Sequence, residues 1–222
     1  SSIYNKPVEE VGGSERFVGK TTILGAGYGM GAVKFQLQLA GMGQDISLVE
    51  AQRIIKVYRD TNDKIKELWA DAGTMLINMY NNTKHNFGKA GVLGMIPEEN
   101  AIVLPSGLLM RYEDLAFETG EMGVEFNYKT RKGRTRIYGG KVVENVCQAI
   151  ARCIIGEQLL QISSRYKVVL TVHDSLACCV PDKEVPKARA YVEECMRWTP
   201  DWAEGLPINC ESGIGKSYGD CE

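Results

Sequence analysis

Residues 13–32, GSERFVGKTTILGAGYGMGA, constrain the fold of this chain more than any other stretch. They contain Gly-Lys-Thr, which ends a phosphate-binding loop, and Gly27, Gly29 and Ala32 satisfy the spacing of a dinucleotide-binding turn. Either motif would require a buried strand in front of a helix, as in parallel α/β folds. A helix with cations on one side, followed by a glycine loop, requires no such strand. The choice among these three interpretations therefore decides the fold class.

Both nucleotide-binding motifs fail in their sequence context. The phosphate loop needs a glycine where Ser14 stands, and the residues before it are polar and turn-like. The dinucleotide turn needs an acidic residue about twenty positions later. Glu50 has that spacing, but it lies in a Ser47–Glu50 pattern typical of a helix capping box. A small-molecule nucleotide enzyme stays only as an alternative.

The third interpretation is a helix with a ligand-binding side. Arg16, Lys20, Leu24 and Tyr28 recur every four residues, so a helix places them along one side. Such a side suits an extended ligand, with phosphates at the cations and a flat base at the tyrosine ring. The glycines that follow fit a place where a partner approaches the backbone closely. An amphipathic surface helix that runs into a loose loop is the open alternative.

The charge of the chain limits how it can contact nucleic acid. Its 222 residues are 44% hydrophobic, enough for one core or two lobes, and the net charge is −2. Any contact with nucleic acid must therefore come from a local basic patch. One dense basic cluster favours phosphate binding, although a solvated hairpin tip is the alternative. The cluster comprises Lys129, Arg131, Lys132, Arg134, Arg136 and Lys141.

The cysteines indicate a reducing compartment. There are seven of them, an odd number without a Cys-x-x-Cys pair, and several lie in apolar runs. This usage predicts buried free thiols. The sequence has neither a signal peptide nor a long apolar span, so we expect a cytoplasmic protein without a membrane partner.

Hydrophobic periodicity divides the rest of the chain into helices and short strands. Residues 47–80 have the spacing of one or two amphipathic helices, which we interpret as scaffold. Residues 86–140 are rich in glycine and alternate in places, which predicts short strands joined by turns. Residues 140–162 again predict a helix, with an apolar stripe from Val143 to Ile154.

A polar side of the 140–162 helix is a candidate DNA contact. Lys141, Asn145, Gln148 and Arg152 follow 4-3-4 spacing on a side away from the apolar stripe. An amide on this side can donate to the minor-groove acceptors that base pairs share. Such a contact checks the shape of a base pair without selecting sequence. A plain solvent-facing side is the alternative.

Residues 167–181, KVVLTVHDSLACCVP, predict a tight hairpin with His173 and Asp174 at its tip. A carboxylate next to buried β-branched residues is costly unless it binds a cation or a donor. Asp174 is therefore a candidate magnesium ligand. An ordinary turn aspartate is the alternative, and Ser175 beside it carries no charge.

The stretch RFVGKTTILGAGYG resembles the fingers helix of family A (DNA polymerase I-like) DNA polymerases. The family pattern is Arg, three residues, Lys, seven residues and Tyr-Gly, and Arg16, Lys20, Tyr28 and Gly29 match it in register. The sequence departs from the family at one position. Where the family has an aromatic ring that contacts the nucleotide sugar, this chain has Leu24. This departure bears on base stacking and on sugar selectivity.

Five further segments resemble the family in the correct order, and YGGKVVENV looks like phage members. The segments are IYNKPVEEV, ISLVEAQRIIKVYRDTNDKIKELW, VVENVCQAIARCII, LTVHDS and LPINCESGIGKSYGD. The resemblance implies an α+β fold of polymerase fingers helices and an antiparallel, incomplete palm sheet. Residues 1–85 would be fingers. Residues 86–222 would be a palm portion with a basic hairpin insert, a metal-binding hairpin and a C-terminal strand.

The resemblance also implies a role for each candidate residue in template-directed DNA synthesis. Arg16, Lys20, Leu24 and Tyr28 would bind the incoming dNTP, and Lys20 would assist catalysis. His173 would position the primer end, and Asp174 would hold magnesium. The residues expected to contact primer-template DNA are Gly29, Arg136, Lys141, Asn145, Gln148 and Arg152.

The family uses a two-metal Mg²⁺ site, and its second carboxylate is not apparent in this sequence. Two metal ions need at least two acidic ligands, and Glu211 is only a distant second candidate after Asp174. In the family another metal-binding aspartate precedes the fingers helix. We therefore expect an N-terminal polymerase portion on another chain to be needed for full activity. The open alternative is a remnant that binds nucleic acid without catalysis.

Overall fold

The computed structural model describes residues 2–89, 91–120 and 123–221, which form two compact units. The first unit comprises Ser1–Phe87, Met95–Ile102 and Arg111–Val146. The second unit comprises Gly88–Gly94, Val103–Met110 and Cys147–Glu222. The boundary between them falls within one long helix, so each unit is described by itself.

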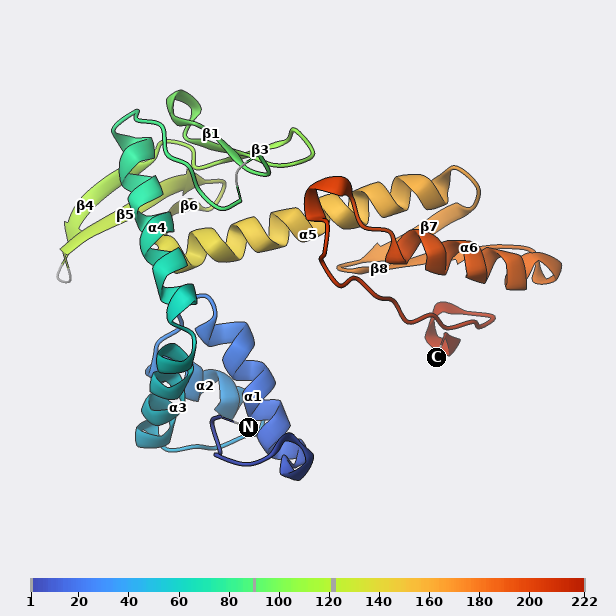
Figure 1. Cartoon of the computed structure of the whole chain (residues 1–222), viewed down its shortest axis with the longest axis horizontal. Helices are drawn as coiled ribbons and strands as arrows, with labels where there is room; N and C mark the ends of the chain where they lie inside the picture. Colours follow the sequence, from blue (N-terminus) through green and yellow to red (C-terminus); the bar gives the residue numbers. More distant parts are fainter. Residues whose placement is uncertain (1, 90, 121–122, 222) are drawn as a thin grey trace. The chain divides into compact units, whose positions relative to one another are not determined.

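The first unit begins with a helical lobe in which three helices contact one another and a fourth continues the chain (Figure 1). A short 3-10 helix, Val8–Glu10, precedes them. The third helix begins after Ser47, whose hydroxyl oxygen accepts a 3.1 Å hydrogen bond from the Glu50 amide, which forms one half of the predicted capping box. The Glu50 carboxylate pairs with Arg53 instead. The four helices are α1 (Gly13–Ala26), α2 (Ala32–Gly41), α3 (Leu48–Thr61) and α4 (Asp63–Tyr80).

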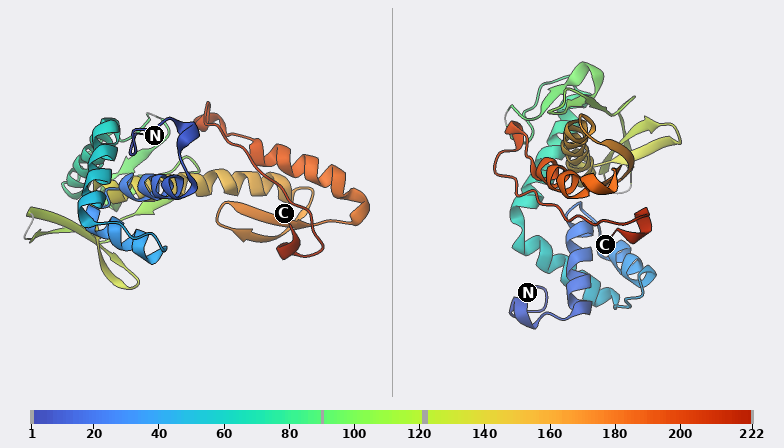
Figure 2. Two further views of the ribbon diagram at one scale, coloured as in Figure 1. Left: turned by 90° about the horizontal axis from the view of Figure 1, so that it is seen from below. Right: turned by 90° about the vertical axis from the view of Figure 1, so that its right-hand side faces the viewer.

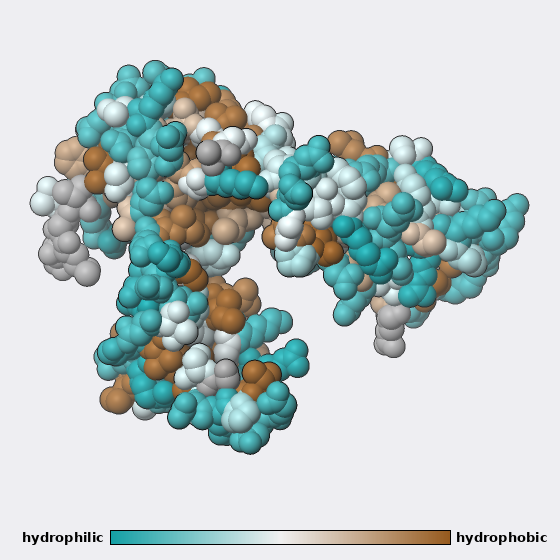
Figure 3. Space-filling view, viewed as in Figure 1, coloured by the Kyte–Doolittle hydropathy of each residue, from teal (hydrophilic) through white to brown (hydrophobic). Residues whose placement is uncertain are grey.

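The core of this lobe forms because the apolar residues of α1, α2 and α3 recur at helical spacing. Phe35, Leu39 and Ile54 are fully buried. Figure 3 shows hydrophobic and hydrophilic residues side by side on the outside of the lobe. The outer surface is therefore not uniformly polar.

Two small sheets follow the helices. The strands β1 (Gly94–Ile96), β2 (Ala101–Val103) and β3 (Leu109–Arg111) form one sheet in that order, with the 3-10 helix Pro97–Glu99 between the first two. The strands β4 (Ala116–Gly120), β5 (Gly123–Thr130) and β6 (Gly133–Ile137) form an antiparallel meander. The register pairs Phe126 with Phe117 on one side and with Ile137 on the other. The short strands predicted between residues 86 and 140 are thus present.

The long helix α5 (Gly139–Ser163) begins against the first unit through two glycines. A Cβ on Gly140 would lie 2.6 Å from the carbonyl oxygen of Tyr28, and a Cβ on Gly139 would clash with the carbonyl oxygen of Trp69. A side chain at either position would therefore displace backbone. Further along, Val143, Val146 and Ile154 are buried, which confirms most of the predicted apolar stripe.

The second unit contains the predicted hairpin and a helix that lies along one of its faces (Figures 1 and 2). Gln158 on α5 is fully buried, and its amide nitrogen donates to the carbonyl oxygens of Met196 at 2.9 Å and Trp198 at 3.0 Å. These bonds tie α5 to the end of the last long helix. The elements are β7 (Lys167–Val172), β8 (Ser175–Cys179), α6 (Val185–Arg197) and the 3-10 helices Asp182–Glu184, Asp201–Ala203 and Tyr218–Asp220.

The prediction of a C-terminal strand in the segment LPINCESGIGKSYGD is wrong. Residues 206–217 form no strand and run past α6. Side chains hold this segment: Asn209 accepts a hydrogen bond from Arg197, and Ser212 donates one to Glu193. A strand needs a neighbouring strand to pair with its amides and carbonyls, and side-chain contacts to a helix do not replace that ladder.

The structure bears on two expectations, that the cysteines are buried free thiols and that no segment spans a membrane. The seven cysteines, all within the described residues, form no disulfide, but Cys147, Cys179 and Cys221 are exposed, so the expectation of buried thiols holds only in part. Over the described residues, no helix combines the length and the apolar character needed to cross a membrane.

Candidate nucleotide and nucleic-acid site

The outward side of α1 carries the candidate nucleotide ligands. Arg16 and Lys20 are exposed and form no ion pair with the described residues, and Leu24 is 59% exposed. The opposite side of α1 is held in the core by Val18 and neighbouring residues. Sequence reasoning missed Ile23, which is 63% exposed beside Leu24 and extends the apolar part of this surface. Two free cations followed by exposed apolar side chains form a surface that suits a phosphate-bearing ligand with an apolar part.

Tyr28 does not continue the helical series, because α1 ends at Ala26. The next residues form a turn in which the amide of Tyr28 donates to the carbonyl oxygen of Gly25 at 3.1 Å, and Gly29 has φ +83°. That φ lies in the left-handed region, which glycine adopts at no steric cost. The interpretation of four residues on one helical side is therefore wrong at its last member.

This turn is fixed by the rest of the first unit. The indole nitrogen of Trp69 donates a 2.9 Å hydrogen bond to the carbonyl oxygen of Gly27. A Cβ on Gly29 would lie 3.3 Å from the Tyr138 ring, and Gly140 fits against the Tyr28 carbonyl. The close approach expected at the glycines is thus made by the protein's own chain. It places the end of α1 directly at the start of α5.

The polar side of α5 is partly occupied by contacts within the protein. Lys141 forms a 2.7 Å ion pair with Glu144. The Asn145 amide donates to the hydroxyl oxygen of Tyr112 at 3.4 Å, and burial raises the pKa of Tyr112 to about 12. Gln148 and Arg152 are exposed. Gln148 and Arg152 therefore present the exposed part of this side, and Asn145 also has a structural role.

Except for Lys141 on α5, the basic cluster lies on the β5–β6 hairpin, and its cations differ in whether they form ion pairs. Arg134 pairs with Asp114 at 2.6 Å, and Arg136 pairs with Glu125 at 2.8 Å. The remaining cations of the hairpin are exposed, and none forms an ion pair within the described part of the chain. These are Lys129, Arg131 and Lys132.

The β7–β8 hairpin turns through His173 and Asp174, with Val172 paired to Ser175. His173 has φ +53°, a conformation uncommon for a residue with a Cβ. Asp174 is exposed at the tip, and the Ser175 hydroxyl donates to the Val172 carbonyl oxygen at 2.8 Å. The turn thus projects the Asp174 side chain from a fixed backbone.

The strand residues before Asp174 are not buried, so the predicted cost of the Asp174 charge is wrong. Val172, the adjacent residue of β7, is 40% exposed, and Leu170 is 41% exposed. As an exposed carboxylate, Asp174 fits the oxygen chemistry of magnesium and can offer one ligand. The described residues contain no group of three or more His, Cys, Asp or Glu able to hold a metal ion, and Glu211 lies in the exposed tail.

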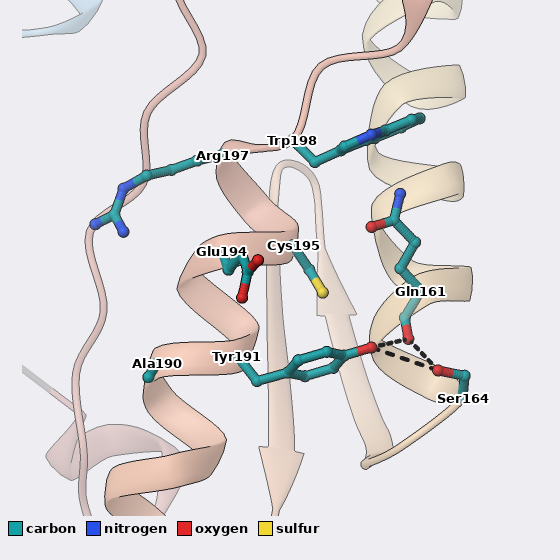
Figure 4. A pocket seen from close by; sticks show the side chains of 8 residues that line it. All are labelled: Gln161, Ser164, Ala190, Tyr191, Glu194, Cys195, Arg197 and Trp198. Carbon is teal, nitrogen blue, oxygen red and sulfur yellow. Dashed lines mark hydrogen bonds between the residues drawn. The ribbon is translucent and has the colours of Figure 1, made fainter.

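A separate cavity of about 660 Å³ lies within the second unit, between α5 and α6 (Figure 4). Figure 4 shows the Tyr191 hydroxyl pointing to the end of α5, where it donates to the Gln161 carbonyl oxygen at 3.0 Å. The Trp198 ring lies above Gln161, and Arg197 points away from the cavity. No sequence motif indicated this cavity.

The chain is similar in sequence to a phage DNA polymerase. It is 28% identical to a protein described as a DNA polymerase of Bacillus phage SP02, over 98% of this chain and 35% of that polymerase. The chain thus spans about a third of the length of that relative. No protein-family model matches the chain.

The fold is similar to that of a polymerase domain. The solved structure is described as the POL domain of Pol1 from M. smegmatis in complex with DNA primer-template and dNTP. The TM-score is 0.55 at 18% identity, over 95% of this chain and 31% of that chain. The α+β architecture of helices with small antiparallel sheets is therefore confirmed. The predicted resemblance to DNA polymerases is also confirmed.

Proposed function

We propose that this chain is the nucleotide-binding and partial palm portion of a family A-type DNA polymerase, which transfers dNTPs to a primer 3′-hydroxyl under the direction of a template. Residues 1–85 act as fingers and residues 86–222 as the palm portion. Arg16 and Lys20 bind the triphosphate, and Leu24 and Tyr28 lie against the sugar and base.

One observation carries this proposal: the exposed cations of α1 lead into a turn that is packed on the start of α5. Charge-assisted bonds from Arg and Lys are suited to phosphate oxygens. The Tyr28–Gly29 turn lies within contact distance of Tyr138 and Gly140. A nucleotide held along α1 would therefore end next to the helix that carries the amide side chains proposed to follow the DNA minor groove.

DNA binding is proposed for the exposed polar residues that follow this turn. Gln148 donates to minor-groove acceptors, which are common to all base pairs, and Asn145 assists it. Arg152 and the hairpin cations contact phosphates. Gly29 keeps the turn narrow enough to lie against the template. The remaining proposed phosphate contacts are Arg136 and Lys141.

Asp174 is proposed to hold magnesium at the tip of the β7–β8 hairpin, with His173 positioning the primer end. Bound magnesium would lower the pKa of the primer hydroxyl and neutralise charge on the phosphates. The backbone of the turn orients the Asp174 carboxylate, and Ser175 adds no charge. Since this hairpin has one carboxylate, a second must come from elsewhere. We propose an N-terminal polymerase portion on another chain as its source.

A second candidate function is a remnant that binds nucleic acid without catalysis. It is favoured by Ser175, whose hydroxyl donates back to Val172 and carries no charge next to Asp174. The two candidates differ in nucleotide binding. A remnant would bind DNA but would gain no dNTP affinity on addition of magnesium.

The test is dNTP binding by the whole chain on primer-template DNA with magnesium, for Arg16→Ala and Lys20→Ala. Each substitution removes bonds to a charged group worth about 1.5–3 kcal/mol, so we expect affinity to fall roughly 10- to 100-fold. Lys34→Ala, an exposed cation on α2, is the matched control and should bind as the unsubstituted chain does.

Primer extension completes the test. Adding an aspartate-bearing upstream polymerase fragment should restore extension that the chain alone lacks. Normal extension by the chain alone would refute the need for that portion. Unchanged dNTP affinity in both α1 variants would favour the remnant. Binding of ATP or NAD without DNA binding would favour a small-molecule nucleotide enzyme.

A further inference from the structure

A cleft of about 630 Å³ lies within the first unit, between α4 and the β4–β5–β6 sheet. One stripe of α4 faces it with Gly73, Ile77 and Tyr80, which are spaced by four and three residues. The sheet faces it with Phe117 and Phe126, which are directly paired across β4 and β5. The cleft is therefore walled by regular elements on both sides and lies apart from the outward side of α1.

Three aromatic rings form its wall. The Tyr80 and Phe117 ring centroids are 4.9 Å apart with nearly perpendicular planes, and Phe126 lies 6.2 Å from Tyr80. Tyr80 remains 44% exposed, Phe117 45% and Ile77 50%. Apolar side chains that line a hollow and stay half exposed mark a surface built to be covered.

The charges around the cleft indicate what covers it. Arg136 and Glu125 line the cleft and neutralise each other across a 2.8 Å ion pair. From Phe126, β5 continues to the hairpin tip, about 13 Å away at the usual strand rise. The tip carries the exposed cations Arg131 and Lys132, which have no ion pair among the described residues. Phe126 of the ring wall and the free cations thus lie on one hairpin, a few nucleotides apart.

We propose that this cleft binds an unpaired base of single-stranded DNA, while the phosphates on one side of that base contact the cations of the hairpin tip. Stacking suits every base, because each has a flat face, and backbone cations add affinity without sequence preference. Duplex bases are stacked on one another and cannot enter. This inference rests on the proposed function for its choice of DNA, and it adds a contact for template that is not paired.

Charge complementarity argues against the other occupants. A second copy of the chain would bring the same cations against themselves, and a plain apolar peptide would leave them without partners. Single-stranded DNA is therefore the occupant that fits the cleft and its neighbouring cations. Self-association and peptide binding become outcomes that overturn the proposal.

The test measures binding of a short fluorescein-labelled oligothymidylate to the whole chain by anisotropy, with a blunt-ended DNA duplex, which has no unpaired bases, as a second probe. Phe117→Ala and Tyr80→Ala should each weaken oligothymidylate binding about tenfold, since stacking on one ring is worth about 1–3 kcal/mol. Duplex affinity should stay unchanged. Phe117→Trp should restore binding, and Leu37→Ala, at an apolar and even more exposed site on α2, should have no effect.

The cations have their own readout. Arg131→Ala and Lys132→Ala should each lower the slope of log affinity against log salt for the oligothymidylate by about 0.7. If an alanine variant fails to fold, the site can be located on the unsubstituted chain by photocrosslinking it to a bromodeoxyuridine-labelled oligonucleotide. The crosslink should map to the peptides that contain Tyr80, Phe117 or Phe126.

Failure of this inference is distinguishable from failure of the proposed function. The proposed binding of an unpaired base in the cleft would be refuted if the ring variants bound oligothymidylate as well as the unsubstituted chain does. Crosslinks confined to other peptides would refute it too. Neither result would contradict binding of duplex DNA. A dimer that Phe117→Ala disrupts would assign the cleft to a second copy instead. Absence of binding to both probes would reject the proposed function as well.

Discussion

The indole nitrogen of Trp69 on α4 donates a 2.9 Å hydrogen bond to the carbonyl oxygen of Gly27, just past the end of α1. A helix end leaves carbonyl oxygens without partners, and this bond satisfies one of them. It fixes where the Tyr28 turn begins. The placement of the candidate nucleotide site therefore depends on a residue of the fourth helix.

Trp69→Phe tests that dependence. The substitution keeps a ring and removes the donor, so we expect a loss of about 1 kcal/mol in unfolding free energy. Hydrogen exchange should show faster exchange for amides of residues 27–29 than for those of α2. Unchanged protection of the turn would mean that the bond does not hold it.

Gly140→Ala should destabilise the chain by about 1–3 kcal/mol, because the new Cβ would lie 2.6 Å from the Tyr28 carbonyl oxygen. Gly156→Ala is the matched control on the same helix. Nothing lies within 4 Å of a Cβ there, so that variant should gain up to about 1 kcal/mol from helix propensity. Chemical denaturation measures both. Similar effects of the two substitutions would contradict the tight packing of α5 on the turn.

Asp174→Asn should remove magnesium-dependent primer extension by the reconstituted polymerase, by at least about a hundredfold, because a metal ligand contributes several kcal/mol. Stability should change by no more than about 0.5 kcal/mol, since the side chain is exposed. Asp182→Asn, an exposed aspartate paired with Lys216, is the control and should extend primers normally. Full extension by the Asp174 variant would remove this residue from the metal site.

The attachment of the C-terminal segment should depend on pH through Glu193. The Ser212 hydroxyl, and after it Arg189 and Arg197, lower the pKa of Glu193 to about 2. Because the folded-state pKa lies below the ordinary 4.5, the stabilisation is complete above that value and is lost as pH falls towards 2. Hydrogen exchange of residues 209–212 should therefore accelerate as pH falls through this window, after correction for intrinsic rates. Glu193→Gln should show fast exchange at every pH, and a protected tail in that variant would contradict the assignment.

Local pattern was enough to predict much of this protein. The Ser47 cap, the hairpin turn at His173 and Asp174, and the apolar stripe on α5 depend on residues close together in sequence. The resemblance to DNA polymerases was also readable, because the spacing of Arg16, Lys20, Tyr28 and Gly29 from which it was predicted is a local feature of the sequence.

Contacts between distant segments decided the rest. The bond from Trp69 to Gly27, the bond from Asn145 to Tyr112 and the contact of the Tyr80 and Phe117 rings join residues that are 33 to 42 positions apart. Periodicity records which side of an element is buried, but not which other element covers it. The end of α1 and the lack of a strand over residues 206–217 were therefore set by tertiary packing, since a turn and a strand both form only where partners for their backbone groups exist.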